Sequence, residues 1–298
     1  MATHYILGLA AGLGAAFFQS SSYLFSRRFL QREPGGILSL LTFSHLLMGA
    51  FSLVLLPTCW AGWDILHAAA IRQLVAAALF YFMGQAGLFW TLQRVESSRV
   101  APLLGIKIIV LALIVTLWQG QVLGLPRWVA VLMSAGAAFL LNEAGGRLPW
   151  QSLAGLVTAV IGYSLSDLNI TALVHSLQPA GAAAPLLGVA LSYLLCGVMS
   201  LPLLLVTGRG APATWRRAAP YAASWFIAMM LLFTCFGAIG VVFGNIVQSL
   251  RGLISIGLGV WVARAGWTHL ETHVPRRVFW RRFAGALLML GAIALYVR

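Results

Sequence analysis

Long hydrophobic runs separated by short polar breaks fill almost the whole chain. Each run is about 20 residues long, the length of helix that crosses roughly 30 Å of hydrocarbon. The alternation that barrel strands require is missing, and backbone inside a membrane must satisfy its own hydrogen bonds, so the runs are interpreted as helices. The pattern predicts an all-α membrane protein with ten transmembrane helices, at residues 5–25, 36–57, 70–92, 99–119, 126–142, 151–174, 184–206, 218–239, 243–263 and 279–297.

A weak internal repeat divides the chain. The stretch that begins at Ile6 aligns with the one that begins at Leu153, and the stretch from Pro126 resembles the one from Arg281. We therefore expect two five-helix halves, residues 1–145 and 146–298. Because five is odd, the second half would enter the membrane from the opposite side, which makes the halves inverted repeats about a pseudo-two-fold axis in the membrane plane. This architecture favours alternating access around a site near mid-membrane.

The composition agrees with a membrane protein and argues against several other classes. Hydrophobic residues make up 61% of the chain and charged residues only 8%, whereas about a quarter of the residues of a soluble domain are charged. No metal-ligand spacing, catalytic constellation or nucleotide-binding loop is recognisable in the sequence, so we expect no cofactor, no metal and no enzyme activity. Most arginines flank the hydrophobic runs, where a net charge of +13 sets orientation and meets anionic lipid rather than nucleic acid.

One charge lies near the middle of a predicted span. Arg251 interrupts the run GNIVQSLRGLISIGLGVW. An arginine at the centre of a spanning helix costs about 2.5–3.5 kcal/mol on insertion scales, so we expect its side chain to face the protein interior. At helical spacing Gln248, Arg251 and Ser255 share a face with Gly244 and Gly259. We interpret this face as the wall of a polar cavity, with a structural ion pair or carbonyl clamp as the alternative.

Two more intramembrane charges are candidates for the same cavity. Lys107, in the fourth span, lies near the position pseudo-equivalent to Arg251, so two cations are predicted to face one cavity; a lysine reaching to the lipid interface is the alternative. Asp167, in the sixth span, is a candidate both for an ion pair with either cation and for a proton carrier. His45 is a weaker coupling candidate, with a hydrogen-bonded core histidine as the alternative. The remaining candidates for binding a substrate are Asn245, Gln19, Gln85, Trp90 and Tyr163.

Small residues recur at three- and four-residue spacing in two of the predicted spans. In the first span they are Gly8, Gly12 and Ala15, and in the sixth they are Gly155, Ala159 and Gly162. Such spacing places them on one face of a helix and lets two helix backbones approach closely. We interpret these faces as helix–helix seams rather than as sites.

The spans, the inverted halves and the phrases SSRVAPLLGIK and FGNIVQSLRGLIS resemble the drug/metabolite transporter superfamily, in its EamA-type branch. The resemblance implies a permease with a central cavity between its halves. Phosphate-binding members of that superfamily carry basic residues on the fourth and ninth helices, where Lys107 and Arg251 lie. The sequence departs from the family pattern after the fourth helix of each half, where Gly-Gln and Gly-Trp replace Gly-Glu. It also lacks the lysine-ending motif of the nucleotide-sugar translocators.

Three functions follow from these patterns. The first is a secondary active permease for a small organic solute with an anionic group, an amino acid, carboxylate or organic phosphate, which Arg251 and Lys107 neutralise while Gln248 and Ser255 donate or accept hydrogen bonds. The second is a proton-coupled exporter of aromatic or hydrophobic metabolites or drugs, with Asp167 as the carrier. The third is a non-transporting membrane receptor or scaffold. The expected partners are a small-molecule substrate, membrane lipid, and a proton or counter-substrate.

The expected location is a bacterial cytoplasmic (inner) membrane, as an integral multi-pass protein. Two arguments on orientation disagree. Arg72 and Arg127 lie on the predicted side of the termini, whereas most other arginines lie on the opposite side, so the positive-inside rule places both termini outside. The family habit that the resemblance implies places both termini inside.

Overall fold

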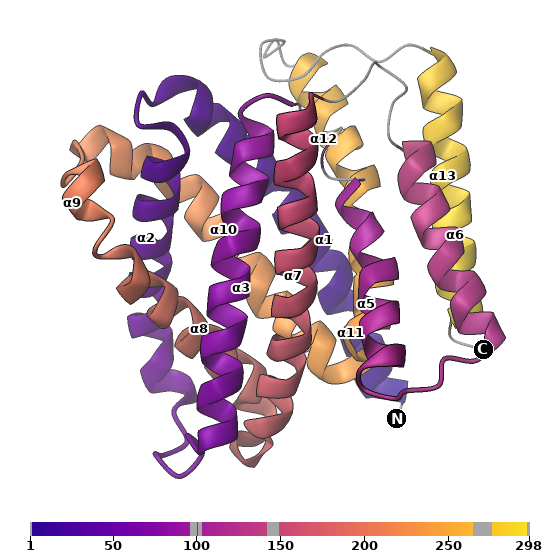
Figure 1. Cartoon of the computed structure of the whole chain (residues 1–298), viewed down its shortest axis with the longest axis horizontal. Helices are drawn as coiled ribbons and strands as arrows, with labels where there is room; N and C mark the ends of the chain where they lie inside the picture. Colours follow the sequence, from indigo (N-terminus) through magenta and orange to yellow (C-terminus); the bar gives the residue numbers. More distant parts are fainter. Residues whose placement is uncertain (1, 96–99, 101–102, 142–148, 265–275, 297–298) are drawn as a thin grey trace.

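The computed structural model describes residues 2–95, 100, 103–141, 149–264 and 276–296, and in these ranges every regular element is helical (Figure 1). The predicted all-α class is confirmed. The 145/146 boundary between the predicted halves and the Gly-Trp pair at 266–267 lie outside the described residues. The elements are α1 (Ala2–Arg32), α2 (Gly36–Cys59), α3 (Ala68–Leu92), η1 (Leu104–Ile106), α5 (Lys107–Leu117), α6 (Leu125–Leu141), α7 (Trp150–Ser176), η2 (Gln178–Ala183), α8 (Ala184–Ser200), α9 (Leu204–Thr207), α10 (Pro212–Ile239), α11 (Val241–Gln248), α12 (Arg251–Arg264) and α13 (Arg276–Tyr296).

Six helical segments in the described residues are long and apolar enough to cross a membrane. They are Gly36–Cys59, Ala68–Leu92, Trp150–Ser176, Gln178–Ser200, Pro212–Ile239 and Val241–Trp261. Shorter apolar helices cover Leu104–Leu117 and Leu287–Tyr296. The count of ten spans stays a prediction, because the predicted spans on α1, α5, α6 and α13 are not among these six segments.

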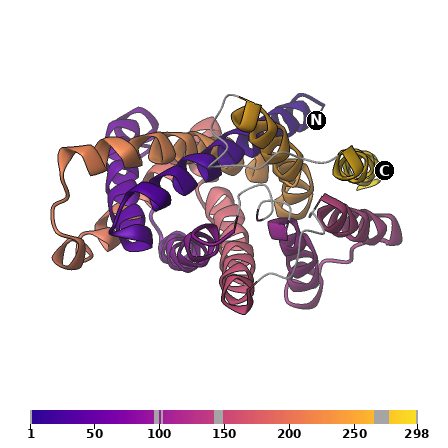
Figure 2. The same ribbon diagram turned by 90° about the horizontal axis from the view of Figure 1, so that it is seen from above.

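Helices from the two predicted halves pack against each other in pairs. Helix α3 lies along α7, α1 along α10, α2 along α8, and α6 along α13. Seen from above, α6 and α13 form one end of the molecule, and α2 and α8 lie toward the other (Figure 2). The halves therefore interdigitate instead of forming separate bundles, while their relation as inverted repeats stays a prediction.

The helix pair α3–α7 approaches closely through glycine. A Cβ atom at Gly162 would lie 2.6 Å from the backbone nitrogen of Gly84 and 2.7 Å from its Cα. One at Gly155 would lie 2.9 Å from the carbonyl oxygen of Gly87. Since real Cβ atoms do not come this close to backbone, only glycine allows this crossing. The predicted seam on the sixth span is confirmed, and on α1 a Cβ at Gly12 would lie 2.8 Å from Cγ1 of Val247.

The ninth predicted span is broken into two helices. Helix α11 ends at Gln248 and α12 begins at Arg251, so the span-length segment Val241–Trp261 contains a two-residue turn that the sequence did not predict. At the break the Leu250 amide donates to the Val247 carbonyl (3.2 Å) and the Gly252 amide to the Ser249 carbonyl (3.0 Å), which is the tighter three-residue pattern. The Ser249 hydroxyl also donates to a carbonyl of α11 (2.5 Å), a bond that competes with regular helix.

Both intramembrane cations begin a helix after a tightened turn. Arg251 is the first residue of α12, and Lys107 is the first residue of α5, directly after the 3-10 turn η1. Broken helices at mid-membrane are tolerated where their backbone lies inside protein or lines a cavity. Both residues are buried, with 2% and 3% of their surface exposed. The breaks therefore bring the two cations to the centre of the molecule.

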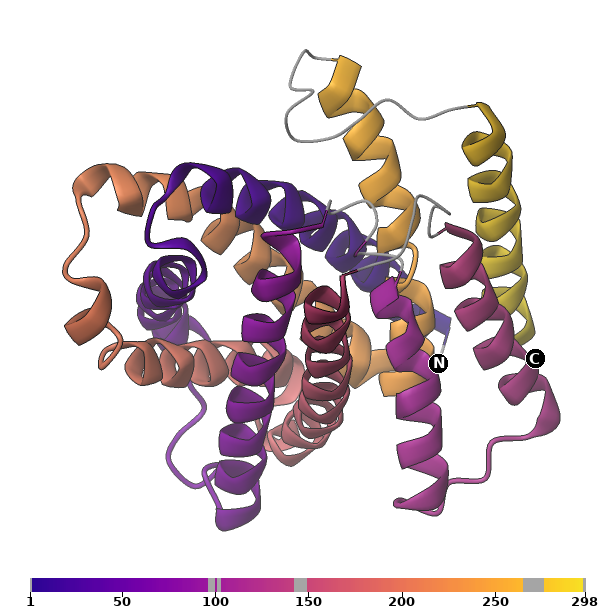
Figure 3. The same cartoon turned by 45° about the horizontal axis from the view of Figure 1, so that its top comes forward.

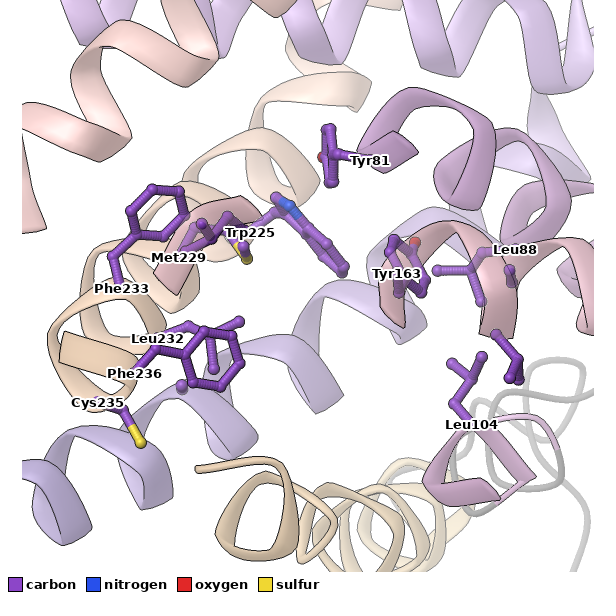
Figure 4. Packing of buried hydrophobic residues seen from close by; sticks show 14 of the residues in the cluster. Tyr81, Leu88, Leu104, Tyr163, Trp225, Met229, Leu232, Phe233, Cys235 and Phe236 are labelled. Atoms are coloured by element: carbon purple, nitrogen blue, oxygen red, sulfur yellow. The ribbon is translucent and has the colours of Figure 1, made fainter. Parts of the chain in front are cut away.

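The interior and the lipid-facing surface differ in the expected way. One large cluster of buried apolar side chains occupies the centre, and Figure 4 shows Tyr81, Tyr163 and Trp225 gathered within it. The outer surface carries large exposed apolar side chains, among them Val54 and Leu117. A soluble protein would bury such residues, whereas hydrocarbon accommodates them. The chain is an integral multi-pass membrane protein.

Candidate functional site

A closed cavity lies where α1, α3, α5, α7, α10, α11 and α12 meet. Its volume is about 10 Å³, no more than a single water molecule needs. Five of the twelve lining residues are sequence-predicted site residues, and Asp167, the predicted coupling residue, is a sixth. The lining residues are Gln19, Tyr23, Tyr81, Lys107, Tyr163, Ser166, Asp167, Trp225, Met229, Leu232, Gln248 and Arg251.

One wall of the cavity carries a buried ion pair. Lys107 Nζ lies 2.7 Å from Asp167 Oδ2, and Asn245 Nδ2 donates to the same oxygen over 2.9 Å. Asn245 also donates to the Val241 carbonyl within α11 (2.9 Å). The structure thus selects Lys107, rather than Arg251, as the partner of Asp167, and it places the lysine away from the lipid interface. The pair is formally neutral.

The opposite wall carries Arg251 without a carboxylate. Its Nη1 donates to Gln19 Oε1 (3.2 Å), which also accepts from Gln248 Nε2 (2.8 Å). The Ser20 hydroxyl donates to the Arg251 carbonyl (2.9 Å). Among the described residues no acidic oxygen lies within 4.0 Å of the guanidinium, and its Nε has no hydrogen-bond partner. Arg251 is therefore a buried positive charge whose hydrogen-bonding capacity is only partly used.

Aromatic side chains form the third wall. The Trp225 ring lies 5.9 Å from Tyr221, 6.1 Å from Tyr81 and 6.3 Å from Tyr163, measured between ring centroids. Its indole nitrogen donates to the Tyr193 hydroxyl (2.8 Å). Figure 4 shows Tyr81, Trp225 and Tyr163 next to one another. An aromatic wall of this kind suits a flat or apolar solute.

Gln85 lies behind this wall instead of lining the cavity. It accepts a hydrogen bond from the Tyr163 hydroxyl and donates one to the Tyr221 hydroxyl. These contacts tie α3 to α7 and α10, and they fix the orientation of two rings. Gln85 is fully buried, and its contacts are those of a positioning residue.

Asn245, which holds Asp167, is not part of the cavity lining, and three further predicted residues also lie outside it. Trp90 is 44% exposed, and the Arg94 guanidinium lies 4.4 Å from its ring centroid; placing it in the cavity was wrong, because a tryptophan near a helix end favours the membrane interface. His45 is fully buried, with Nδ1 donating to the Leu41 carbonyl (2.6 Å), which matches the core-histidine alternative. Ser255 is buried one turn beyond Arg251, and its hydroxyl has no partner among the described residues.

Sequence reasoning missed several lining residues, although some signals were present. Tyr23 follows Gln19 by four residues and so shares its face of α1. Met229 and Leu232 follow Trp225 by four and seven residues on α10, again along one helix face. Their apolar side chains gave no reason to separate them from ordinary core.

An open pocket, which we call the vestibule, is lined by Tyr5 and Tyr296, and therefore lies on the side of the molecule where α1 begins and α13 ends (Figure 1). It has a volume of about 820 Å³ and is lined by residues that include Tyr5, Arg127, Leu168, Val241 and Tyr296. Leu168 adjoins Asp167 in sequence, and the Val241 carbonyl holds Asn245. The floor of the vestibule therefore lies next to the acidic wall of the closed cavity.

On the opposite side of the molecule, an ion pair joins the end of α1 to α10. Arg217 Nη1, near the start of α10, lies 2.5 Å from Oε1 of Glu33, which follows the last residue of α1. The Thr214 hydroxyl donates to the other oxygen of Glu33 (3.3 Å). The cavity thus has a vestibule on one side and a fastened helix pair on the other.

Comparisons with known proteins agree with this architecture. The EamA-like transporter family model matches residues 6–143, whereas a search of curated proteins found no match. A solved structure, titled only "Crystal structure of protein", is similar with a TM-score of 0.62 and 13% sequence identity, covering 99% of this chain and 96% of that chain. At this identity the likeness shows the shared fold alone. The family match over residues 6–143 supports membership of the drug/metabolite transporter superfamily, in its EamA-type branch, which is a family of membrane transporters.

Proposed function

We propose that the protein is a secondary active permease that moves a small organic solute with an anionic group by alternating access through the central cavity. The observation that carries the proposal is Arg251, a buried guanidinium with no acidic partner within 4.0 Å among the described residues. Since the ion pair of Lys107 with Asp167 is neutral, the three charges leave the cavity with a formal charge of +1. An unpaired buried charge is unfavourable by several kcal/mol, and an anionic solute would relieve that cost.

The arrangement around Arg251 supports binding of a carboxylate or phosphate. A guanidinium offers a fork of donors that matches two anionic oxygens, and its Nε is still unused. In the proposed bound state Gln248 adds a neutral donor, and Lys107 adds a second cation if Asp167 releases it.

The packing of the helices supports alternating access. In the predicted halves α1 corresponds to α7, α2 to α8, α3 to α10 and α6 to α13. The contact of α1 with α10 therefore has its counterpart in the contact of α7 with α3, and the α2–α8 and α6–α13 pairs each join two corresponding helices. A symmetric arrangement of this kind lets one set of helices rock against the other. We propose that the vestibule and the fastened α1–α10 ends represent one of two such states. By the positive-inside rule, the arginine-rich ends would lie in the bacterial cytoplasm and the vestibule would open outward.

The test is ligand-dependent thermal stability of the purified protein with a panel of carboxylates, amino acids, organic phosphates, and aromatic or cationic compounds. Anionic compounds should raise the melting temperature, because a ligand that binds the native state stabilises it by mass action. Arg251→Gln should weaken their binding by roughly 30- to 150-fold, which corresponds to the loss of about 2–3 kcal/mol from a charged hydrogen bond.

The matched control is Arg94→Gln, which removes a surface arginine that stacks on Trp90. It should leave the anion response unchanged. Stabilisation by aromatic or cationic compounds that survives in Arg251→Gln would contradict the proposal and assign Arg251 a structural role.

The aromatic wall supports a second candidate, a proton-coupled exporter of aromatic or hydrophobic metabolites with Asp167 as the carrier. Protonation of Asp167 would remove its negative charge and break its ion pair with Lys107. Asp167 therefore holds either a proton or the lysine, but not both. Acidifying the side from which protons enter should therefore accelerate solute exchange. Lys107→Met/Asp167→Asn, which removes both charges together, should abolish this acceleration in reconstituted vesicles. Transport still driven by a pH gradient in that variant would exclude Asp167 as the carrier.

A further inference from the structure

Four arginines gather around a hollow at the end of the α1–α10 pair, on the side opposite the vestibule. Arg28 and Arg32 come from α1, and Arg216 and Arg217 come from the first turns of α10. The hollow has a volume of about 170 Å³, and its apolar wall is the partly exposed ring of Phe25, with the buried Phe29 behind it. We call this hollow the arginine pocket. Figure 3 shows α1 and α10 lying side by side, as their contacts require.

The arginine pocket lies at the predicted edge of the hydrocarbon. The first predicted span ends at residue 25 and the eighth begins at residue 218, so the apolar wall adjoins the hydrocarbon and the guanidinium groups lie beyond it. On α1 the four lining residues are spaced at i, i+3, i+4 and i+7, which places them on one helix face. One face therefore offers phenylalanine and arginine at the depth where lipid chains meet their headgroups.

The charge of the arginine pocket is strongly positive. Glu33 neutralises one arginine through its 2.5 Å contact with Arg217. The four arginines and Glu33 together have a formal charge of +3. The Glu33 contact also fixes the wall, because it joins the end of α1 to the start of α10. The pocket is thus a preformed cationic site, distinct from the central cavity.

We infer that the arginine pocket binds the phosphate headgroup of an anionic phospholipid, with a lipid chain running along the partly exposed ring of Phe25. Clustered arginines close to a membrane surface attract anionic lipid, each contributing about a fivefold gain in binding. The apolar wall distinguishes this ligand from a soluble phosphate, which has nothing to place against the Phe25 ring. A lipid bound there bridges α1, which carries Gln19, and α10, which carries Trp225. It would therefore stabilise the contact between α1 and α10.

The experiment is native mass spectrometry of the purified full-length protein in a neutral detergent, titrated with phosphatidylglycerol. Phosphatidylcholine and inorganic phosphate serve as separate titrations. We expect saturable binding of phosphatidylglycerol, which is at least tenfold weaker in Arg32→Gln/Arg216→Gln. Arg217 is left in place so that its contact with Glu33 persists. Circular dichroism and the lipid-free melting temperature verify that the variant is folded.

The matched control is Arg94→Gln/Arg127→Gln, which removes the same charge from two exposed arginines outside the pocket. It should keep the affinity for phosphatidylglycerol. An equal loss in both double variants would overturn the proposal, since binding would then follow overall charge. Equal binding of phosphatidylcholine would overturn it by removing the need for an anion. Phosphate that displaces the lipid at similar concentrations would overturn the role of the apolar wall.

Discussion

Lys107→Met is expected to lower the free energy of unfolding by about 3–5 kcal/mol, the largest effect of any single substitution considered. The variant leaves Asp167 as a buried carboxylate without its cationic partner 2.7 Å away. Breaking a buried pair in this way is far more harmful than removing it entirely. Equilibrium unfolding in mixed micelles, followed by tryptophan fluorescence, measures the change.

The control for this prediction is Lys107→Met/Asp167→Asn. Both charges are then absent, and the introduced amide can still accept the hydrogen bond that Asn245 donates to Asp167. We expect the double variant to recover most of the lost stability. A double variant as unstable as Lys107→Met would show that methionine packing, rather than an uncompensated charge, causes the loss.

Gly162→Ala is expected to lower the free energy of unfolding by about 1–3 kcal/mol. The added methyl group would lie 2.6 Å from the backbone nitrogen of Gly84 and 2.8 Å from the Phe80 carbonyl oxygen. These atoms belong to a helix backbone and cannot rotate away, so α3 and α7 must separate along their seam. The same unfolding measurement detects the loss.

Gly257→Ala provides the matched control for the seam. Gly257 lies within α12, and an added Cβ there would meet no atom within 4 Å. Alanine is the better helix former by about 1 kcal/mol, so this variant should be neutral or more stable. Similar losses in both variants would mean that the close contact of α3 with α7 does not limit stability.

The sequence predicted the helices well because hydrocarbon imposes simple rules on length and composition. It could not show the break between Gln248 and Arg251, since neither proline nor a run of glycines marks the turn. The break depends on the Ser249 hydroxyl and on burial of the turn among neighbouring helices, which are tertiary effects. The seam of Gly155 and Gly162 was predictable because close packing in membranes favours small residues.

The charged residues of the central site were predictable, because burying a charge in a membrane costs much free energy. Lys107, Asp167 and Arg251 stood out as intramembrane charges, and all three line the cavity. The choice of partner for Asp167 was not predictable, because it depends on distances between α5, α7 and α12. The error at Trp90 has a related cause, since an aromatic residue near a helix end suits both a cavity and a membrane interface.

The closed cavity has a thermodynamic consequence for every ligand. A volume of about 10 Å³ cannot hold an organic solute, so binding requires a wider conformation that the empty protein populates only in part. The measured dissociation constant is then the intrinsic constant divided by the fraction of competent molecules, and a fraction of about 1% would weaken it about 100-fold. Weak binding at equilibrium is therefore compatible with a well-matched site. The site selects solutes whose contacts with the cavity walls offset the free energy needed to move those walls apart.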